Sequence, residues 1–412
     1  MSRVPRIRFK GFEEDWEQRK LGEIFKEYSE KNHVELPPLT IIQGGGTIRR
    51  DESDRALQYD KGSLSNYKMV NKDDFIVHLR SFEGGLEKAN SIGIISPAYH
   101  TFSGENTDTT FYYTYFRSKK FVEIDLKPHV YGIRDGRSID IEGMKTIKIP
   151  YTIFKEQMCI GKAIDVIDHL ITLHQRKLKK LKNIKKSMLE NLFPKNGEKT
   201  PRIRFSGFTE DWEQRKLGEI FIYLRNNTLS REELNDEYGV AQSIHYGDVL
   251  IKYGECLNVS NELLPFINQQ YIVDKFKKCY IQNGDIIIAD TAEDETVGKC
   301  TEISGIVNQN IILGLHTIPL RPVNKFANGY LGFYLNSNSY HKQLKPLMQG
   351  IKVISISKNS LKTTVLEYPS EINEQQKIGT CFQSLDHLIT LHQSKLEKLR
   401  KIKKSMLESM FV

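Results

Sequence analysis

The sequence predicts an α+β protein with two similar globular α+β domains, separated by two long helices packed as an antiparallel coiled coil. Two pairs of matching strings predict this pseudo-two-fold internal duplication. PRIRFKGFEEDWEQRKLGEIF at Pro5–Phe25 returns as PRIRFSGFTEDWEQRKLGEIF at Pro201–Phe221. The string beginning DHLITLHQ at Asp168–Phe193 returns at Asp386–Phe411. The residues between these strings have diverged, so the two halves are expected to share a fold and to differ in their loops.

Each opening segment contains one of the two tryptophans in the chain, Trp16 or Trp212. Because they stand at matching positions, we expect both to be buried structural anchors rather than rings that stack on a ligand. In the first half, Asp15 is expected to cap a short helix that runs to Leu21 and ends at Gly22. The second half is expected to repeat this helix.

Between the opening segment and the long helix, each half has short β-rich runs separated by Gly, Asn and Asp turns. These runs are Asp74–Leu79, Ile92–Ile95, Asp285–Ala289 and Ile311–Leu315. One helix per half is also predicted, at Thr110–Leu126 and at Gly329–Leu344. Each half is thus expected to hold an α+β domain.

The stretches Glu156–Phe193 and Glu374–Phe411 contain no proline, and apolar residues recur in them with 3–4 spacing. Such a seam predicts that the two helices pack against each other. His174 and His392 stand at equivalent seam positions, where packed polar residues are favoured over metal ligands. The expected divisions are a first domain at 1–155, a central helix at 156–194, a linker at 195–200, a second domain at 201–372 and a C-terminal helix at 373–412.

Composition indicates a soluble intracellular protein. Lys+Arg number 60 against Asp+Glu 52, a net charge of +8 that favours a polyanionic partner. The five cysteines include no C-x-x-C pair and are expected to be reduced thiols. The first residues do not resemble a signal peptide, and no apolar run is long enough to cross a membrane. We therefore expect a cytoplasmic location and no membrane association.

The sequence lacks the common catalytic signatures. There is no [N/D]-P-P-[Y/F] loop of an amino-methyltransferase, no G-x-x-x-x-G-K-[S/T] phosphate loop and no H-E-x-x-H zinc motif. The Asp-Glu-Lys nuclease signature has no obvious start, and the zinc-deaminase pattern is incomplete. We expect no catalytic residues, no metal and no cofactor.

Basic and polar residues on predicted turns, many beside aromatic residues, are the candidates for DNA binding. Such side chains can bind base edges or neutralise phosphates, although solvated surface charge is the alternative for any one of them. In the first half the candidates are Arg49, Arg50, Lys68, Arg80, Ser81, Arg134 and Arg137. In the second half they are Arg225, Lys252, Tyr253, Thr291, Lys299 and Lys352.

Two further features are open to more than one interpretation. The glycine run Gln43–Gly46 suggests an anion-cradling loop, but a flexible turn is favoured because the second half has no equivalent. The basic run from Arg176 to Lys186 on the central helix is either a solvated flank of the seam or a contact for DNA phosphate or an acidic partner.

Three features together are similar to a known family. They are the opening W-E-Q-R-K-L-G-E-I-F of each half, the variable domain, and the terminal D-H-L-I-T-L-H-Q…K-K-S-M-L-E helix. The chain resembles the DNA-specificity (S) subunits of type I restriction–modification enzymes over its whole length. The resemblance implies two target-recognition domains, each binding one half of a split, asymmetric double-stranded DNA target, and no catalytic activity. It also implies two modification (methyltransferase) subunits as partners, joined in a larger complex by restriction (translocase–nuclease) subunits.

Three alternatives remain open at this point. The chain is a nucleic-acid-binding module that works alone, a helical scaffold protein without a restriction–modification partner, or an enzyme with an unrecognised motif. The terminal helices disfavour the first, the basic loops the second and the motif search the third. Neighbouring genes for an adenine methyltransferase and a helicase-type nuclease would distinguish the specificity subunit from all three.

Overall fold

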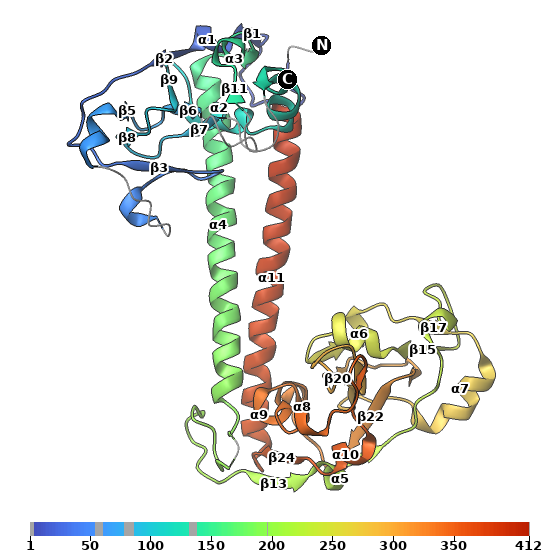
Figure 1. Ribbon diagram of the computed structural model, residues 1–412. Helices are drawn as coiled ribbons and strands as arrows, with labels where there is room; N and C mark the ends of the chain where they lie inside the picture. The colour runs from blue at the N-terminus through green and yellow to red at the C-terminus, as the bar shows by residue number, and fades with distance from the viewer. Residues whose placement is uncertain (1–3, 54–60, 78–85, 132–137, 196, 412) are drawn as a thin grey trace. The chain divides into compact units, whose positions relative to one another are not determined.

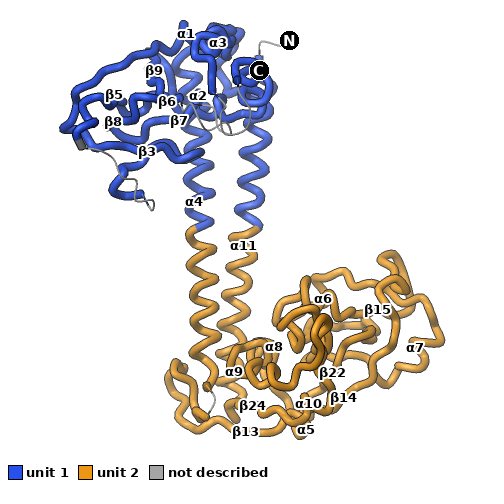
Figure 2. Tube along the Cα trace, in the orientation of Figure 1, with its two compact units in different colours: residues 1–175, 394–412 blue, residues 176–393 orange. Residues whose placement is uncertain are grey.

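The computed structural model describes residues 4–53, 61–77, 86–131, 138–195 and 197–411 (Figure 1). The chain divides into two compact units, residues 1–175 with 394–412 and residues 176–393 (Figure 2). Two long helices, α4 (Phe154–Asn191) and α11 (Ile372–Met410), each contribute to both units. Among the described residues, no helix is both long and apolar enough to cross a membrane.

The first unit is built from short strands and helices. Its strands are β1 (Glu17–Lys20), β2 (Phe25–Tyr28), β3 (Leu39–Ile42), β4 (Gly46–Arg49), β5 (Lys68–Val70), β6 (Phe75–Val77), β7 (Leu86–Lys88), β8 (Gly93–Ile95), β9 (His100–Gly104), β10 (Val130–Tyr131), β11 (Ser138–Ile139) and β12 (Lys148–Tyr151). Besides α4 and α11, its helices are α1 (Leu21–Ile24), α2 (Thr109–Phe116) and α3 (Ile141–Lys145). The central sheet is antiparallel in the order β2-β9-β6-β7, and β1–β12, β3–β4, β5–β8 and β10–β11 form separate pairs.

Aromatic side chains fill the core of the first unit. Trp16 is 1% exposed and lies in one cluster with Phe25, Phe111 and Phe116. From the end of α11, the ring of Phe411 packs 6.4 Å from that of Trp16, measured between centroids. The tryptophan is thus a structural anchor, as predicted.

The second unit has more strands in its main sheet. Its strands are β13 (Glu213–Lys216), β14 (Phe221–Tyr223), β15 (Ala241–Ile244), β16 (Cys256–Asn258), β17 (Phe266–Ile267), β18 (Ile286–Ala289), β19 (Thr291–Ala292), β20 (Cys300–Ser304), β21 (Ile311–Leu313), β22 (Thr317–Pro322), β23 (Ile354–Ser355) and β24 (Val365–Tyr368). Besides α4 and α11, its helices are α5 (Leu217–Ile220), α6 (Tyr246–Ile251), α7 (Gln270–Phe276), α8 (Tyr330–Leu335), α9 (Asn338–His341) and α10 (Lys358–Lys362). The sheets run β14-β22-β18-β20-β16 and β17-β15-β21, with β13–β24 and β19–β23 as pairs.

The core of the second unit repeats the anchor of the first. Trp212 is 4% exposed, and the ring of Phe193 from the end of α4 lies 6.5 Å from it. The four predicted β-rich runs form β6, β8, β18 and β21, which confirms them as strands. Each predicted domain helix is broken. In the first half α2 ends at Phe116 and a π-helical turn follows at Lys120–Asp125, whereas in the second half α8 and α9 share the predicted range.

The prediction for the opening segments was wrong. Residues Glu17–Lys20 form strand β1 paired with β12, and the helix begins at Leu21, where the prediction ended it. Gly22 lies inside α1 because the helix passes close to α3: a Cβ atom at this position would lie 3.0 Å from Cβ of Lys145. The glycine therefore permits close packing and does not terminate the helix.

A glutamate–glutamine pair at the start of each long helix ties the opening segment to the domain. Glu156 is buried and accepts hydrogen bonds from Arg8 at 2.7 Å and from the Trp16 indole at 3.1 Å. Gln157 bonds the backbone of Asp108 and Thr152. In the second half, Glu374 and Gln375 make the corresponding contacts with Arg204, Ala327 and Pro369.

Within each unit, the segments of α4 and α11 run side by side (Figure 2). In the first unit Lys403 binds Asp168 at 2.6 Å, and in the second unit its repeat equivalent, Lys185, binds Asp386 at 2.7 Å. The predicted seam positions are buried or half-buried in both helices, whereas their neighbours are mostly exposed. Two copies of one ion pair therefore stabilise the predicted seam.

Candidate nucleic-acid interface

Three candidate cations of the first unit have partners for their side chains within the fold, and one of them, Arg50, lies against Tyr67. The Arg50 guanidinium lies 5.4 Å from the Tyr67 ring centroid and donates to its hydroxyl at 3.4 Å. Lys68, the next residue, donates its ammonium to the carbonyl of Tyr99 at 2.6 Å, and burial lowers its pKa. Arg49 is exposed and binds Asp51 at 2.9 Å. These cations are fixed in place by the fold and are partly balanced.

Four candidates of the first half, Arg80, Ser81, Arg134 and Arg137, lie outside the described residues. They belong to the stretches 78–85 and 132–137, next to β7 and between β10 and β11. Their assignment as DNA-binding residues stays a prediction.

In the second unit, three candidates meet at the end of helix α6. Lys252 is exposed, binds Glu262 at 3.0 Å and places its ammonium 5.2 Å from the Tyr253 ring centroid. Tyr253 itself is 4% exposed and belongs to a hydrophobic core cluster. Lys299 donates to the carbonyl of Leu250 at 2.7 Å, and burial lowers the pKa of its ammonium. Of the three, Lys252 is the one that presents its charge to solvent.

At the start of α6, the structure adds a residue that sequence reasoning missed. Nδ1 of His316 lies 3.2 Å from both Oδ1 of Asp290 and Oγ1 of Thr291, and its ring packs against Tyr246. His316 has a positive φ of 56°, which is uncommon outside glycine and is often found at functional sites. No sequence motif marks this histidine, because its partners come from separate segments.

Lys352 and Arg225 are both exposed. Lys352 follows the left-handed Gly350, and the residues after it pair with β19, which contains Thr291. Arg225 places its guanidinium 5.6 Å from the Phe276 ring centroid on helix α7. Both cations are therefore accessible to a polyanion.

The glycine run Gln43–Gly46 is the turn of the β3–β4 hairpin, and its amides already bind an anion. The backbone N–H groups of Gly44 and Gly46 donate to the buried carboxylate of Glu87 at 2.7 and 3.2 Å. Arg117 and Tyr113 donate to the same carboxylate at 2.7 Å each. Since Glu87 occupies the amides, the turn interpretation is favoured over a phosphate site.

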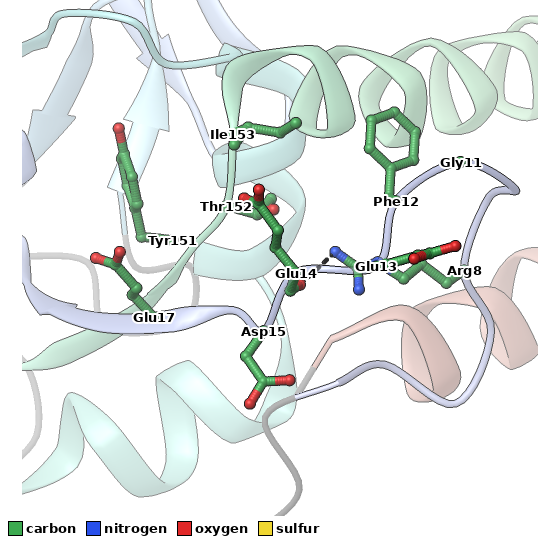
Figure 3. A pocket seen from close by; sticks show the side chains of 10 residues that line it. All are labelled: Arg8, Gly11, Phe12, Glu13, Glu14, Asp15, Glu17, Tyr151, Thr152 and Ile153. Atoms are coloured by element: carbon green, nitrogen blue, oxygen red, sulfur yellow. Dashed lines mark hydrogen bonds between the residues drawn. The ribbon is translucent and has the colours of Figure 1, made fainter.

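A shallow pocket of about 320 Å³ lies at the first opening segment (Figure 3). Glu13, Glu14, Asp15 and Glu17 line it together with Tyr151. Arg8 also lines the pocket but is paired with Glu156, so the acidic rim disfavours the binding of phosphate there. In the described part of the chain, no cluster of three or more His, Cys, Asp or Glu residues could hold a metal ion. All five cysteines are free thiols.

Comparisons with known proteins found a matching family, a similar sequence and similar structures. Residues 209–401 match the family described as the type I restriction modification DNA specificity domain. A putative type I restriction enzyme specificity subunit, MjaX of Methanocaldococcus jannaschii, is 25% identical over 211 residues. That match covers 49% of this chain and 46% of the relative, so the chain spans about half the length of that protein.

Two solved structures were also similar. The crystal structure of a type I restriction–modification S subunit from M. genitalium matches with a TM-score of 0.56 at 16% identity, covering 99% of both chains. The HsdS subunit from Thermoanaerobacter tengcongensis gives a TM-score of 0.47 at 14% identity, covering 96% of both chains. The first of these shows that the fold is shared.

The chain is thus an α+β protein whose second half carries a type I restriction modification DNA specificity domain. The predicted resemblance to the specificity subunits of type I restriction–modification enzymes is confirmed.

Proposed function

We propose that the chain recognises a split, asymmetric double-stranded DNA target, with each domain binding one half of it. The observation that carries the proposal is that one repeated frame holds two different domains. The pairs β1–β12 and β13–β24 and the helices α1 and α5 repeat almost unchanged. Between them, the first domain has a four-stranded sheet and the second has a five-stranded and a three-stranded sheet.

The recognition domains would be residues 1–155 and 201–372, and the helices 156–194 and 373–412 would set the gap between the half-targets. Different domains give different half-sites, so the target is not palindromic. Rigid helices fix the distance between the two domains, and this distance determines the gap between the half-targets. Half-site spacing is set in the same way in other two-site DNA-binding proteins.

The chain directs partners to DNA and performs no catalysis itself. The partners are two modification (methyltransferase) subunits, with restriction (translocase–nuclease) subunits in the larger complex, and the location is cytoplasmic. The duplicated frame supports this stoichiometry, because two copies of one docking surface can hold two copies of one partner.

Base and phosphate contacts are assigned to the exposed cations first. Among the described candidates these are Arg49, Arg225, Lys252 and Lys352. Arg80 and Arg137 are proposed to read bases, because they have no basic counterpart in the second half. Arg134 and Lys352 occupy matching positions in the strings LKPHVYGIR and LKPLMQGIK, so they are proposed to bind phosphate.

A domain exchange tests this function. Residues 26–150 are replaced by those of a relative, the protein is expressed with its methyltransferase, and methylated adenines are mapped across the genome. We expect one half-target to change and the other to stay. A change in both half-targets would contradict the modular assignment. Methylation that is the same with and without this chain would favour a scaffold or a module that works alone.

A further inference from the structure

A dense group of exposed cations lies on helix α4 inside the second unit. We name it the basic stripe. Its members are Arg176, Lys177, Lys179, Lys180, Lys182 and Lys186, and all six are exposed. No acidic residue occurs between Arg176 and Lys186, a span of roughly 15 Å at the α-helical rise.

The charges of the basic stripe are not balanced within the described part of the chain. No ion pair joins any of the six to a described carboxylate. The contrast is Lys185, which faces the seam and binds both Glu255 at 2.9 Å and Asp386 at 2.7 Å. The fold therefore neutralises the inward lysine and leaves the outward cations without an ion-pair partner among the residues that the structure describes.

Spacing within the basic stripe adds like-charge repulsion. Arg176 and Lys180 are four residues apart, as are Lys182 and Lys186, and Lys179 and Lys182 are three apart. Like charges at these spacings lie next to each other on a helix and destabilise it. A bound polyanion would remove this repulsion, so the free helix is predisposed to bind one.

The surroundings favour a phosphate backbone over a protein partner. Part of the stripe lines a shallow depression of about 440 Å³ together with Asn183, Ile184 and Ser187. Ile184 is the apolar residue of that lining and is 37% exposed. Protein interfaces depend on buried aromatic and apolar anchors, whereas phosphate contacts come from Arg, Lys, Asn and Ser. Duplex DNA carries roughly one charge per 1.7 Å, which suits a stripe of this density.

We propose that the basic stripe binds the phosphate backbone of duplex DNA without regard to sequence, adding affinity outside the recognition domains. The proposal rests on the proposed function, since it requires that the chain binds DNA. The repeat on α11 in the first unit is weaker: Ser394 replaces Arg176 and Glu397 replaces Lys179. The stripe on α4 is therefore the one to test.

The test compares two double variants on the same helix. Lys179→Gln with Lys182→Gln removes two charges from the stripe, and Lys155→Gln with Lys162→Gln removes two exposed charges from outside it. Glutamine retains helix propensity, and circular dichroism checks that helicity is unchanged. Each variant is purified as the full chain with its methyltransferase, and its binding to duplexes with and without the mapped target is measured from 50 to 300 mM KCl.

We expect the slope of log K against log salt to fall by about 1.8 for the stripe variant, at about 0.9 per phosphate contact. The fall should be equal for target and non-target duplexes, and the control variant should keep the wild-type slope. An unchanged slope with target binding intact would overturn the proposal while leaving the proposed function in place. An unchanged slope with loss of the methyltransferase from the complex would overturn it in favour of an acidic protein partner. If the wild-type complex bound no duplex at all, the proposed function itself would fail.

Discussion

Two buried glutamates at matching positions offer a quantitative test of how the repeated frame is stabilised. Glu156 accepts two hydrogen bonds from Arg8, at 2.7 and 2.9 Å, one from the Trp16 indole at 3.1 Å and one from Thr152. The carboxylate is completely buried, so its removal leaves several donors without an acceptor. We predict that Glu156→Ala strongly destabilises the first unit.

The second copy is the internal control. Glu374 accepts the corresponding bonds from Arg204 at 2.7 and 2.8 Å. The indole N–H of Trp212, however, has no hydrogen-bond partner among the described atoms. Among the described atoms, no hydroxyl donates to Glu374 as Thr152 does to Glu156, so Glu374→Ala should break the same ion pair but strand two donors fewer.

The magnitude follows from these contacts. Breaking a buried ion pair by removing one partner costs about 3–5 kcal/mol. The arginine side chains are 11% and 15% exposed and can regain some water, which places the cost for Glu374→Ala near 3 kcal/mol. Leaving the Trp16 N–H and the Thr152 hydroxyl unbonded adds about 1 kcal/mol each, so Glu156→Ala should cost about 5 kcal/mol.

The two tryptophans report on the two sites separately. Urea unfolding is followed by fluorescence in a Trp212→Phe background for the first unit and in a Trp16→Phe background for the second. At a slope of roughly 2 kcal/mol per M, the midpoints should fall by about 2.5 M for Glu156→Ala and about 1.5 M for Glu374→Ala. A smaller shift for Glu156→Ala than for Glu374→Ala would refute the reasoning, because the additional bonds from the indole and from the Thr152 hydroxyl would then contribute nothing.

Three further predictions concern DNA binding and pH. Inserting four residues, about one helical turn, after Leu178 should lengthen the tolerated gap between half-targets or abolish binding; methylation mapping with an unchanged gap would show that the helices do not set it. Arg80→Ala or Arg137→Ala should cost roughly 1–3 kcal/mol of binding free energy and relax the base preference at one position of the first half-site. Lys352→Ala should weaken binding to all duplexes evenly and lower the salt slope by about one. Titrations with duplexes that carry single base-pair substitutions separate the two outcomes. Burial raises the pKa of Glu302 from its ordinary 4.5 to about 7, so its contribution to stability is full below pH 4.5 and is lost as the pH rises through 7; the loss should be about 3 kcal/mol, and Glu302→Gln should abolish this part of the pH dependence in urea unfolding.

The sequence predicted those parts of the fold that produce a periodic pattern of apolar residues or that occur in both copies of the repeat. The seam positions of α4 and α11, such as Leu181 and Leu399, are half-buried as the 3–4 spacing requires. Trp16 and Trp212 are both buried, as expected for an aromatic residue that is retained in both copies and fills the equivalent position in each core. Repetition within one chain therefore carried information that a single copy would not have given.

Prediction failed where tertiary contacts override local preference. The sequence predicts a helix end at Gly22, but close packing of α1 on α3 places this glycine inside the helix. The prediction of the candidate site failed for the same reason, because the exposure of a side chain depends on the tertiary fold. Tyr253 is a core residue and Lys299 is bound to a carbonyl, although both resemble surface residues of a turn in the sequence. His316 was missed because Asp290 and Thr291 reach it only through the fold.

The duplication also explains why each compact unit contains residues from both halves. Phe411, at the end of the second half, packs against Trp16 in the first unit. Phe193, at the end of the first half, packs against Trp212 and stacks on Phe382 in the second unit. Each half therefore completes the aromatic core of the other, so either half alone would expose a hydrophobic surface around its tryptophan. This exchange constrains the sequence of the repeated segments far more than the sequence of the loops. A substitution at either phenylalanine changes the packing of a domain that is encoded in the opposite half.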